Sequence, residues 1–497
     1  HVSVLFFLGD RAYKLKKPVA FPFVDLTTRE AREQICRREV ELNRRLAPDV
    51  YLGVIDVSGP DGEPCDHLVV MRRMPADRRL SALVAAGDES AGDAVDQLGE
   101  LIAGFHRGAS RSPTIDRAGS ADAVTGLWHE NFAELRPFAG VVQEGTEREG
   151  AKPGAMLDGA ELSRAEHLAD RFLAGRRPLL EARIAEGAIC DGHGDLLADD
   201  VFCLPDGPRV LDCIEFDDEL RFGDVANDLA FLVMDLDRLG AAHLAARLVR
   251  RYEATAGVVL PAGLLRFYVA YRAQVRAKIA CLRADQHEAG SSERAAAVAE
   301  ARLLLARCVE GLEAAAVRLV LVGGLPGTGK STLARELGDR LGAEVLRSDV
   351  VRKELAGLSP DESGAAAFGA GLYAPAMTDR VYAELAARAA EALAQGRSVV
   401  VDASFVSDPQ RRALRALADA ADVVELCCVL DPGEAARRIE RRRAEGGDPS
   451  DADTQVARAL AAMVDPWPGS LTVSTAAAPP DVVDEVLRRL PRPGLTG

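Results

Sequence analysis

Apolar and polar positions follow different patterns in the two halves of this chain. Near the start, VSVLFFLG and AYKLKKPV are strand-like segments, and residues 9–11 between them predict a tight turn. A helix is expected over residues 28–46, and HLVVMRRM, residues 67–74, predicts another strand. From about Ser81 the pattern becomes helical and rich in alanine. The first 80 or so residues therefore predict a small sheet with one helix.

The middle of the chain predicts helices on both sides of an irregular segment. Residues 109–160 contain many glycine, serine, proline and charged residues, which favour a long loop or insertion. Residues 161–187 have a helical pattern, and RVLDCIEF, residues 209–216, predicts a short apolar strand. Long helices are expected from there to about residue 316.

From Val317 onward, short apolar runs alternate with helical segments. The runs VRLVLVGG, AEVLRSD, RSVVVDAS and DVVELCCVLD all have the length of a strand. Strands that alternate with helices predict a parallel sheet covered on both faces. We therefore expect two domains, residues 1–312 and 313–497, with the second of the α/β class.

Composition narrows the classes of protein that this chain represents. Its 497 residues are enough for two to four domains, and the net charge of −16 argues against a general nucleic-acid or anionic-membrane surface. No apolar run reaches the roughly 18 residues that a membrane span needs. The nine cysteines are scattered and form no CxxC pair, which favours reduced thiols in a cytoplasm. Nothing in the sequence indicates an oligomeric state.

The most specific motif is GLPGTGKST, which lies between an apolar strand and a helical segment. It matches GxxxxGK[ST], the loop whose backbone N–H groups surround a phosphate while lysine neutralises charge and serine holds Mg²⁺. The helix that follows adds its N-terminal dipole. The motif therefore predicts bound ATP, or another nucleoside triphosphate, contacted by Gly324, Leu325, Pro326, Gly327, Thr328, Gly329, Lys330, Ser331 and Thr332.

Residues after this motif resemble the P-loop kinases related to polynucleotide 5′-kinase and the zeta toxins. The resemblance covers about residues 317–497 and rests on VLRSDVVRKEL, VVVDASFVSDPQRR and ARRIERRRAEGGDPSDA. It implies that Asp349 is the base for an acceptor hydroxyl, that Arg352 contacts substrate and that Asp402 holds Mg²⁺. A lid would carry the phosphate-clamping arginines, with Arg438, Arg442 and Arg443 as candidates. Alternatively, Asp349 caps a helix and the arginines lie on a solvated helix face.

The segment CDGHGDLLADD, residues 190–200, resembles the catalytic loop of the aminoglycoside phosphotransferase family, whose fold is similar to that of protein kinases. LGELIAGFH and GDVANDLAFL extend the resemblance, the latter through Asp224 and Asp228. The resemblance implies a bilobal α+β domain, with a small lobe over about residues 1–78 and a helical large lobe over about 79–312. Asp195 would then orient the acceptor hydroxyl and accept its proton.

The small lobe would bind the nucleotide. AYKLKKP resembles the strand with the phosphate-binding lysine, REVELNRRL the helix whose glutamate orients it, and HLVVMRRM the strand next to adenine. Lys14 and Lys16 are two residues apart and face the same side of a strand, so both remain candidates, with Lys14 preferred. The implied nucleotide-binding residues are Lys14, Lys16, Glu39, Met71 and Met74.

Two features differ from the family pattern. No glycine-rich loop precedes the lysine strand, although Gly9-Asp10 could be its reduced form, and Asp200 stands where the family has a metal-binding Asn. An Asp still suits Mg²⁺ but adds negative charge. A second carboxylate for the metal is expected at the next strand end. IEFDD favours Glu215, with Asp217 as an additional acid, whereas VLDC favours Asp212.

Other residues near the motifs allow more than one interpretation. Arg272 and Arg276 are four residues apart on one helical face, which is either a solvated face or an anion-binding wall of a substrate site. His106 is expected to be structural. The sequence thus predicts a bifunctional ATP- and Mg²⁺-dependent kinase that phosphorylates hydroxyl groups of small molecules. The rival hypotheses are a nucleotide-binding sensor with a degenerate first domain and a nucleic-acid 5′-hydroxyl kinase.

Overall fold

The computed structural model describes residues 3–21, 24–140, 155–359, 371–445 and 452–493. Its contacts divide the chain into two compact units. The first unit comprises His1–Ala165 and Leu180–Gly311, and the second comprises Glu166–Leu179 and Leu312–Gly497. The second unit therefore includes a short segment from the middle of the sequence, where Arg176 donates hydrogen bonds to the carbonyls of Leu393 (2.6 Å) and Ala420 (2.5 Å).

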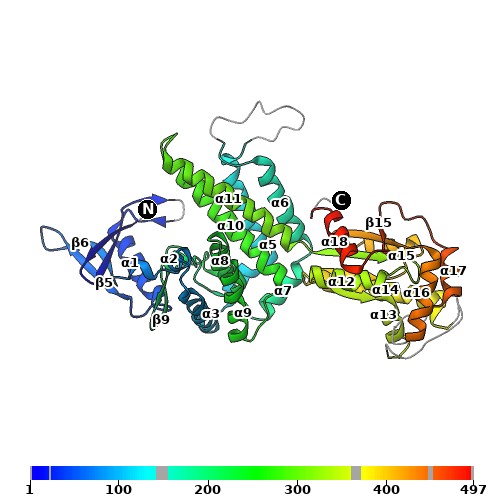
Figure 1. Cartoon of the computed structure of the whole chain (residues 1–497). Helices are drawn as coiled ribbons and strands as arrows, with labels where there is room; N and C mark the ends of the chain where they lie inside the picture. Colours follow the sequence, from blue (N-terminus) through cyan, green and yellow to red (C-terminus); the bar gives the residue numbers. More distant parts are fainter. Residues whose placement is uncertain (1–2, 22–23, 141–154, 360–370, 446–451, 494–497) are drawn as a thin grey trace. The chain divides into compact units, whose positions relative to one another are not determined.

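The first unit begins with an antiparallel sheet in the order β1-β2-β6-β5. The strands are β1 (Ser3–Leu8), β2 (Arg11–Lys16), β5 (Tyr51–Ser58) and β6 (Pro64–Arg72). Helix α1 (Arg29–Asn43) starts after Thr28, whose hydroxyl accepts the Ala31 N–H, and packs on one face of the sheet. The expected hairpin and helix are present, and the strand expected at 67–74 starts and ends earlier (Figure 1).

Most of the rest of the first unit is helical. The main helices are α2 (Leu80–Ala86), α3 (Ser90–Gly108), α5 (Ala121–Leu135), α8 (Val225–Arg238), α9 (Ala242–Ala256), α10 (Ala262–Asp285) and α11 (Ser292–Ala315). Short elements join them: α4 (Pro113–Asp116), β3 (Ala20–Phe21), β4 (Val24–Asp25), β7 (Ile189–Asp191), β8 (Val201–Leu204), β9 (Gly207–Val210) and β10 (Phe222–Asp224).

Three expectations for this region are wrong in detail. The loop expected over residues 109–160 is interrupted by α5, because Ser120 caps that helix and Val124, Trp128 and Phe132 bury one of its faces. Residues 141–154 of that range lie outside the described residues. The strand expected at 209–216 ends at Val210, since Asp212 adopts a left-handed backbone (φ 64°) that a strand does not accommodate. The helix expected over residues 161–187 is two helices, α6 (Gly159–Ala174) and α7 (Arg177–Ala185).

The break between α6 and α7 falls at Gly175 for a steric reason. A Cβ atom on this residue would lie 2.9 Å from Cα of Ala420, so only glycine fits so close to that backbone. Both residues belong to the second unit.

A five-stranded parallel sheet in the order β12-β13-β11-β14-β15 forms the centre of the second unit. The strands are β11 (Arg318–Gly323), β12 (Glu344–Arg347), β13 (Val399–Asp402), β14 (Asp422–Val429) and β15 (Leu471–Ser474). The first four match the expected apolar runs, and β15 was not anticipated. The expected parallel sheet is confirmed.

Helices cover both faces of this sheet, as the doubly apolar strands require. Helices α13 (Ser348–Leu355), α14 (Pro375–Ala394) and α15 (Asp408–Arg415) pack on one face, and α12 (Lys330–Leu341) and α18 (Pro479–Arg489) pack on the other (Figure 1). Two further helices, α16 (Pro432–Glu445) and α17 (Thr454–Ala461), complete the unit. Among the described residues of either unit, no helix is both long and apolar enough to cross a membrane.

Candidate functional site

In the first unit, two buried lysines share one buried carboxylate. Lys14 and Lys16 lie on the same face of β2, and their Nζ atoms are 2.9 and 2.7 Å from the two oxygens of Glu39 on α1. Burial lowers the pKa of each lysine, but the neighbouring carboxylates together outweigh burial and raise both pKa values: Glu39 and Asp212 at Lys14, and Glu39 and Glu215 at Lys16. Burial would likewise raise the pKa of Glu39, but the two ammonium groups hold it below its usual value. All three groups are therefore charged at neutral pH.

Each lysine has a second carboxylate partner, and the two partners differ. Lys14 Nζ lies 2.7 Å from Asp212 Oδ1, while Lys16 forms an ion pair with Glu215. The positive charge of Lys14 lowers the pKa of Asp212. Burial and repulsion from Glu39 raise the pKa of Glu215 despite Lys16. The sequence left Asp212 and Glu215 as alternative metal ligands. In the structure they contact different lysines, and only Asp212 contacts Lys14, the preferred phosphate-binding lysine.

Helix α8 holds the loop that carries His193, Gly194 and Asp195. Asp228 accepts the backbone N–H groups of His193 and Gly194, both at 2.8 Å, and its Oδ2 lies 2.9 Å from His106 Nε2. Burial would raise the pKa of Asp228, but these hydrogen bonds hold it well below its usual range. His106 is therefore structural, as expected, because it binds the residue that shapes the loop.

Three loop-positioning residues escaped the sequence analysis. Arg45 donates hydrogen bonds to the carbonyls of Asp191 (3.1 Å) and Gly192 (2.9 Å). Asp235 accepts the Ala198 N–H at 2.9 Å, and Arg221 donates to Asp191 at 2.8 Å. The contacts of Arg45 span about 146 residues of sequence, so no local pattern could reveal them.

Asp195 lies on this loop among groups of both charges. Burial raises the pKa of Asp195 to about 6, with Arg276 and Arg272 opposing the rise and Asp212 reinforcing it. A carboxyl with such a pKa is ionised at neutral pH and can accept a proton more readily than an ordinary aspartate. Its surroundings suit the predicted role of a base.

A backbone hydrogen bond brings Asp200 close to Asp212. The N–H of Leu211, the residue before Asp212, donates to the Asp200 carbonyl at 3.0 Å. Burial and the charges of Asp212 and Asp195 raise the pKa of Asp200 well above its usual value. A divalent cation would relieve this repulsion, and Mg²⁺ commonly takes one or two carboxylates together with phosphate and water. Asp200 and Asp212 therefore fit the ion. In the described parts of the chain, no three His, Cys, Asp or Glu side chains gather as a metal cluster.

The remaining residues predicted for this site are placed elsewhere. Glu215 is held by Lys16, and Asp217 accepts the backbone N–H of Glu219 at 2.9 Å, which makes it a turn-stabilising residue. Met71 is buried in the core between the sheet and α1, and Met74 packs against that same core.

In the second unit, the glycine-rich loop connects β11 to α12. Gly329 precedes the first helical residue, Lys330, with a φ of 80° that favours glycine. A Cβ atom on Gly327 would lie 2.5 Å from the carbonyl oxygen of Ala435. The Thr475 hydroxyl donates to the Thr328 carbonyl at 2.6 Å. The loop is thus tightly packed. The backbone angle favours glycine at position 329, and the lack of space requires glycine at position 327.

Asp402 ends β13, the strand next to β11, and this register sets it beside the loop. Burial raises the pKa of Asp402, while the charge of Lys330 and the Ser331 hydroxyl oppose the rise. Its Oδ1 atom is buried and accepts no hydrogen bond among the described residues. A buried carboxylate oxygen without a partner, next to a serine and a phosphate-binding loop, fits a Mg²⁺ site. Asp349, in the first turn of α13, is near enough to raise the same pKa.

The arginines predicted for the site of the second unit differ in what they contact. Arg352 points inward, donates to the Leu372 carbonyl at 2.8 Å and lies over the Tyr373 ring at 5.1 Å, so it positions α13 rather than facing the loop. Arg442 donates to the Ala452 carbonyl at 2.8 Å. Arg438 is the arginine beside the loop, because its guanidinium is 3.4 Å from a Cβ built on Gly329. The side chain of Arg443 lies outside the described residues.

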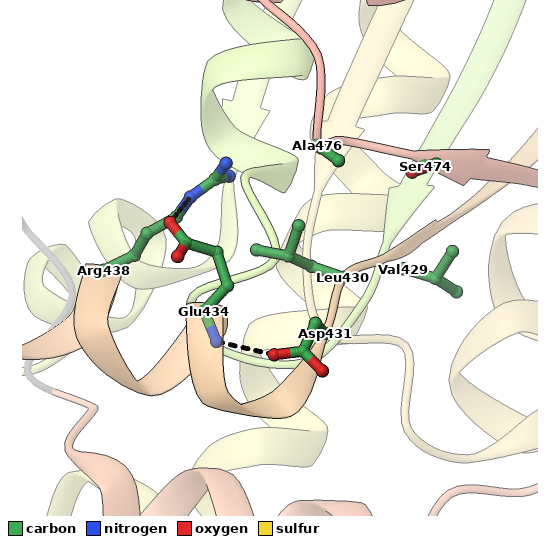
Figure 2. Close-up of a pocket in the computed structure, with 7 residues that line it drawn as sticks. All are labelled: Val429, Leu430, Asp431, Glu434, Arg438, Ser474 and Ala476. Carbon is green, nitrogen blue, oxygen red and sulfur yellow. Dashed lines mark hydrogen bonds and ion pairs between the residues drawn. The ribbon is translucent and has the colours of Figure 1, made fainter.

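A cavity of about 450 Å³ opens between the ends of β14 and β15 (Figure 2). Arg438 and Glu434 come from α16, and Glu434 Oε1 lies 3.4 Å from Arg438 Nε. The Thr475 carbonyl accepts a hydrogen bond from Arg438 at 3.2 Å, which ties the cavity to the loop-holding threonine. The lining residues are Val429, Leu430, Asp431, Glu434, Arg438, Ser474 and Ala476.

Comparisons with known proteins include one family model that matches part of the second unit. Residues 319–467 match the family model AAA_33, described as an AAA domain. Three solved structures are similar over 35% of this chain: a sugar kinase from Janibacter sp. HTCC2649 (18% identity, 93% of that chain, TM-score 0.28), a gluconokinase from Sinorhizobium meliloti 1021 (16%, 90%, 0.26) and a shikimate kinase from Aquifex aeolicus VF5 (16%, 95%, 0.23). Likenesses of this extent assign no substrate.

The mycobacterial relatives are similar over nearly the whole chain. Uncharacterized protein Rv2004c of Mycobacterium tuberculosis (strain ATCC 25618 / H37Rv) is 43% identical over 481 residues, which are 96% of this chain and 91% of the relative. Uncharacterized protein Mb2027c of Mycobacterium bovis (strain ATCC BAA-935 / AF2122/97) matches with the same identity and coverage. The similarity therefore includes both units, and the chain belongs to the same family as these two mycobacterial proteins.

Proposed function

We propose that this protein transfers the γ-phosphate of ATP, or of another nucleoside triphosphate, to hydroxyl groups of small molecules, and that it does so with Mg²⁺ in both units. The observation that carries the proposal is in the second unit. There, the loop around Lys330 lies beside Asp402, which keeps a buried carboxylate oxygen without a partner next to Ser331. Loop, lysine, serine and carboxylate are the parts that phosphoryl transfer needs.

In the second unit, the loop N–H groups and Lys330 would hold the phosphates, and Ser331 and Asp402 would hold Mg²⁺, which neutralises charge on the phosphates. The cavity near Arg438 has a size that suits a nucleobase. Asp349 lies on the opposite side of Asp402 from the loop strand, because β13 separates β12 from β11. It is the residue that we assign to accept the hydroxyl proton of the acceptor.

The first unit supports a second phosphotransfer site. Lys14, ordered by Glu39, would contact the nucleotide phosphates, and Asp200 and Asp212 would hold Mg²⁺. Asp212 supports this role because its φ of 64° is unfavourable for a residue other than glycine, and such conformations are concentrated at functional sites. The site proposed here for the first unit does not include Met71, Met74, Glu215 or Asp217.

The transfer step is the same in both units. The acceptor oxygen attacks the γ-phosphorus and a new oxygen–phosphorus bond forms. The bond from the γ-phosphorus to the oxygen bridging to the β-phosphate breaks, and the nucleoside diphosphate leaves with that electron pair. The hydroxyl proton goes to the carboxylate of Asp195 in the first unit and of Asp349 in the second. Catalysis is mainly positioning and charge neutralisation.

The test is to separate the two sites by substitution in the full chain. Asp195→Ala and Lys330→Ala are each assayed for ATP turnover and for phosphorylated products with a panel of hydroxyl compounds. We expect each variant to lose a different product. If Asp195→Ala changes neither turnover nor any product, the first unit is a nucleotide-binding sensor rather than a kinase. If Lys330→Ala leaves all turnover intact, the assignment of the second unit is wrong.

A further inference from the structure

Arg272 in the first unit is a buried cation with no carboxylate partner among the described residues. Its side chain lies on α10 and is 8% exposed, and its guanidinium lies 4.5 Å from the centre of the Phe231 ring. Its Nε donates to the Asn227 carbonyl at 3.2 Å, and its two terminal nitrogens form no hydrogen bond with any described residue. Arg276, one helical turn further, is half-buried. No carboxylate in the described ranges lies within 4.0 Å of either guanidinium.

Other arginines of the same helical region are neutralised, which makes this pair unusual. Arg183 forms a double hydrogen bond with Asp224 at 2.9 Å. Arg238 pairs with Asp235 at 2.7 Å, and Arg247 pairs with Asp96 at 2.8 Å. A buried charge without a partner is costly, so a pair of unmatched arginines implies an anion that is supplied from outside the chain.

The contacts of Arg272 place it beside the catalytic loop. Asn227, whose carbonyl it contacts, directly precedes Asp228, and Asp228 accepts the N–H groups of His193 and Gly194. Asp195 is the next residue of that loop. The charges of Arg276 and Arg272 both act on Asp195. The contact of Arg272 with Asn227 therefore sets these two arginines near the loop that carries the carboxylate proposed to receive the hydroxyl proton.

We infer that the acceptor of the first unit is an anion, a hydroxyl compound that carries a carboxylate or a phosphate bound by Arg272 and Arg276. The inference rests on the proposed phosphotransfer at Asp195. Arginine suits this role because its planar group of donors matches carboxylate and phosphate oxygens in pairs. The same two charges would repel a cationic acceptor, such as an aminoglycoside, so the first unit would select against that class.

Binding is tested first, because it does not require turnover. Glucose 6-phosphate, gluconate and glucose are titrated into the full chain by calorimetry, with Lys330→Ala as background so that the glycine-rich loop contributes little anion binding. We expect one of the two anions to bind more tightly than glucose. Arg276→Gln should weaken that binding about 10–100-fold, the loss expected for one charge-assisted hydrogen-bonded contact. Arg276→Lys should restore part of it.

The matched control is Arg283→Gln on the same helix, where Arg283 is exposed and paired with Glu300. It should leave binding unchanged. Arg276 is preferred to Arg272 for the main variant, since its half-exposed side chain is less important for folding. Equal binding of glucose and both anions, or anion binding that Arg276→Gln does not alter, would overturn the inference.

Turnover then separates this inference from the proposed function. Asp195-dependent phosphorylation of an anionic acceptor, with a KM raised in Arg276→Gln and an unchanged KM for ATP, supports both. Anion binding that depends on Arg276 without any Asp195-dependent product contradicts the proposed kinase activity of the first unit and leaves the anion site in place. Asp195-dependent phosphorylation of neutral or cationic compounds only, insensitive to Arg276→Gln, contradicts the anionic acceptor and leaves the kinase activity in place.

Discussion

Glu39 receives the ammonium groups of both Lys14 and Lys16, at 2.9 and 2.7 Å, and its side chain is fully buried. One carboxylate cannot neutralise two lysines, and the balance comes from Asp212 on Lys14 and Glu215 on Lys16. The cluster thus joins β2 and α1 to the segment after β9. A single glutamate holds together the side chains on which the proposed nucleotide site of the first unit depends.

Removing Glu39 should therefore destabilise the first unit strongly. Glu39→Ala removes the carboxylate that both buried lysines share and leaves each lysine with one partner, Asp212 or Glu215. Breaking a buried ion pair in this way costs about 3–5 kcal/mol. The loss is measured by urea unfolding with hydrogen exchange mass spectrometry of peptides from residues 3–72. Glu41→Ala, on the same helix but with an exposed side chain, should change stability by less than about 1 kcal/mol. Similar losses for the two variants would contradict this view of the cluster.

The two lysines should differ in function despite their shared partner. Only Lys14 contacts Asp212, the proposed Mg²⁺ ligand, whereas Lys16 is 1% exposed and held by Glu39 and Glu215. We expect Lys14→Met to reduce Asp195-dependent turnover by about 100-fold or more, a loss of ~2.7 kcal/mol in transition-state stabilisation. Lys16→Met should mainly lower stability. Product formation in the Lys330→Ala background checks this, and a larger catalytic loss for Lys16→Met would reverse the assignment.

The sequence predicted what local spacing determines. Nine consecutive residues form the glycine-rich loop, and the two-residue repeat of a strand was sufficient to place Lys14 and Lys16 on one face. It could not choose between Asp212 and Glu215, because the choice depends on the left-handed turn at Asp212 and on partners almost 200 residues away. Arg438, Arg442 and Arg443 are all candidates from their shared helix, and the sequence interpretation preferred Arg442. Only the packing of α16 on the loop distinguishes them.

Asp195 should give the first unit a characteristic pH dependence. Its pKa is raised to about 6, above the ordinary value of 3.8, so the carboxylate that accepts the proton is lost as the pH falls through 6. We expect Asp195-dependent kcat/KM to rise between pH 5 and 7 and then to level off. The measurement is a pH profile of product formation in the Lys330→Ala background, which removes turnover by the second unit. A profile that stays flat between pH 5 and 7 would exclude Asp195 as the base.

The raised pKa of Asp195 also predicts an effect on stability. Ionised Asp195 favours activity, but its ionisation lowers the stability of the folded chain. The folded chain binds this proton more tightly than the unfolded chain, so stability decreases as the pH rises from about 4 to 6. Asp195→Asn should therefore abolish turnover by the first unit while raising the unfolding free energy at pH 8 by ~1–2 kcal/mol. The gain should shrink as the pH falls below about 4, where the carboxyl becomes protonated in both the folded and the unfolded chain. A destabilised variant at pH 8 would show that Asp195 is needed for folding instead.

Asp200 provides a test of the proposed metal site in the first unit. Repulsion from Asp212 and Asp195 raises the pKa of Asp200, and an asparagine would keep an oxygen for Mg²⁺ without the extra charge. Asp200→Asn should change the Mg²⁺ concentration for half-maximal Asp195-dependent activity by about 10-fold, equal to ~1.4 kcal/mol. Asp199→Asn is the control, because the exposed Asp199 side chain accepts a hydrogen bond from the Ser81 hydroxyl instead. Unchanged metal dependence in Asp200→Asn would remove Asp200 from the site.

In the second unit, Arg438 rather than Arg442 should govern nucleotide binding. Arg438 reaches the loop at Gly329 and lines the cavity of Figure 2, whereas Arg442 donates to the Ala452 carbonyl. Arg438→Gln should raise the KM for ATP of the Lys330-dependent reaction about 10-fold, through the loss of ~1.4 kcal/mol of charge-assisted contact.

Arg442→Gln is the matched comparison, since it changes the same residue type one helical turn further along α16. It should alter the KM for ATP less than about 3-fold, because Arg442 contacts the Ala452 carbonyl and not the loop. Both variants are assayed in an Asp195→Ala background, in which only the second unit turns over ATP. A larger rise in KM for Arg442→Gln than for Arg438→Gln would assign the phosphate-clamping role to Arg442 instead.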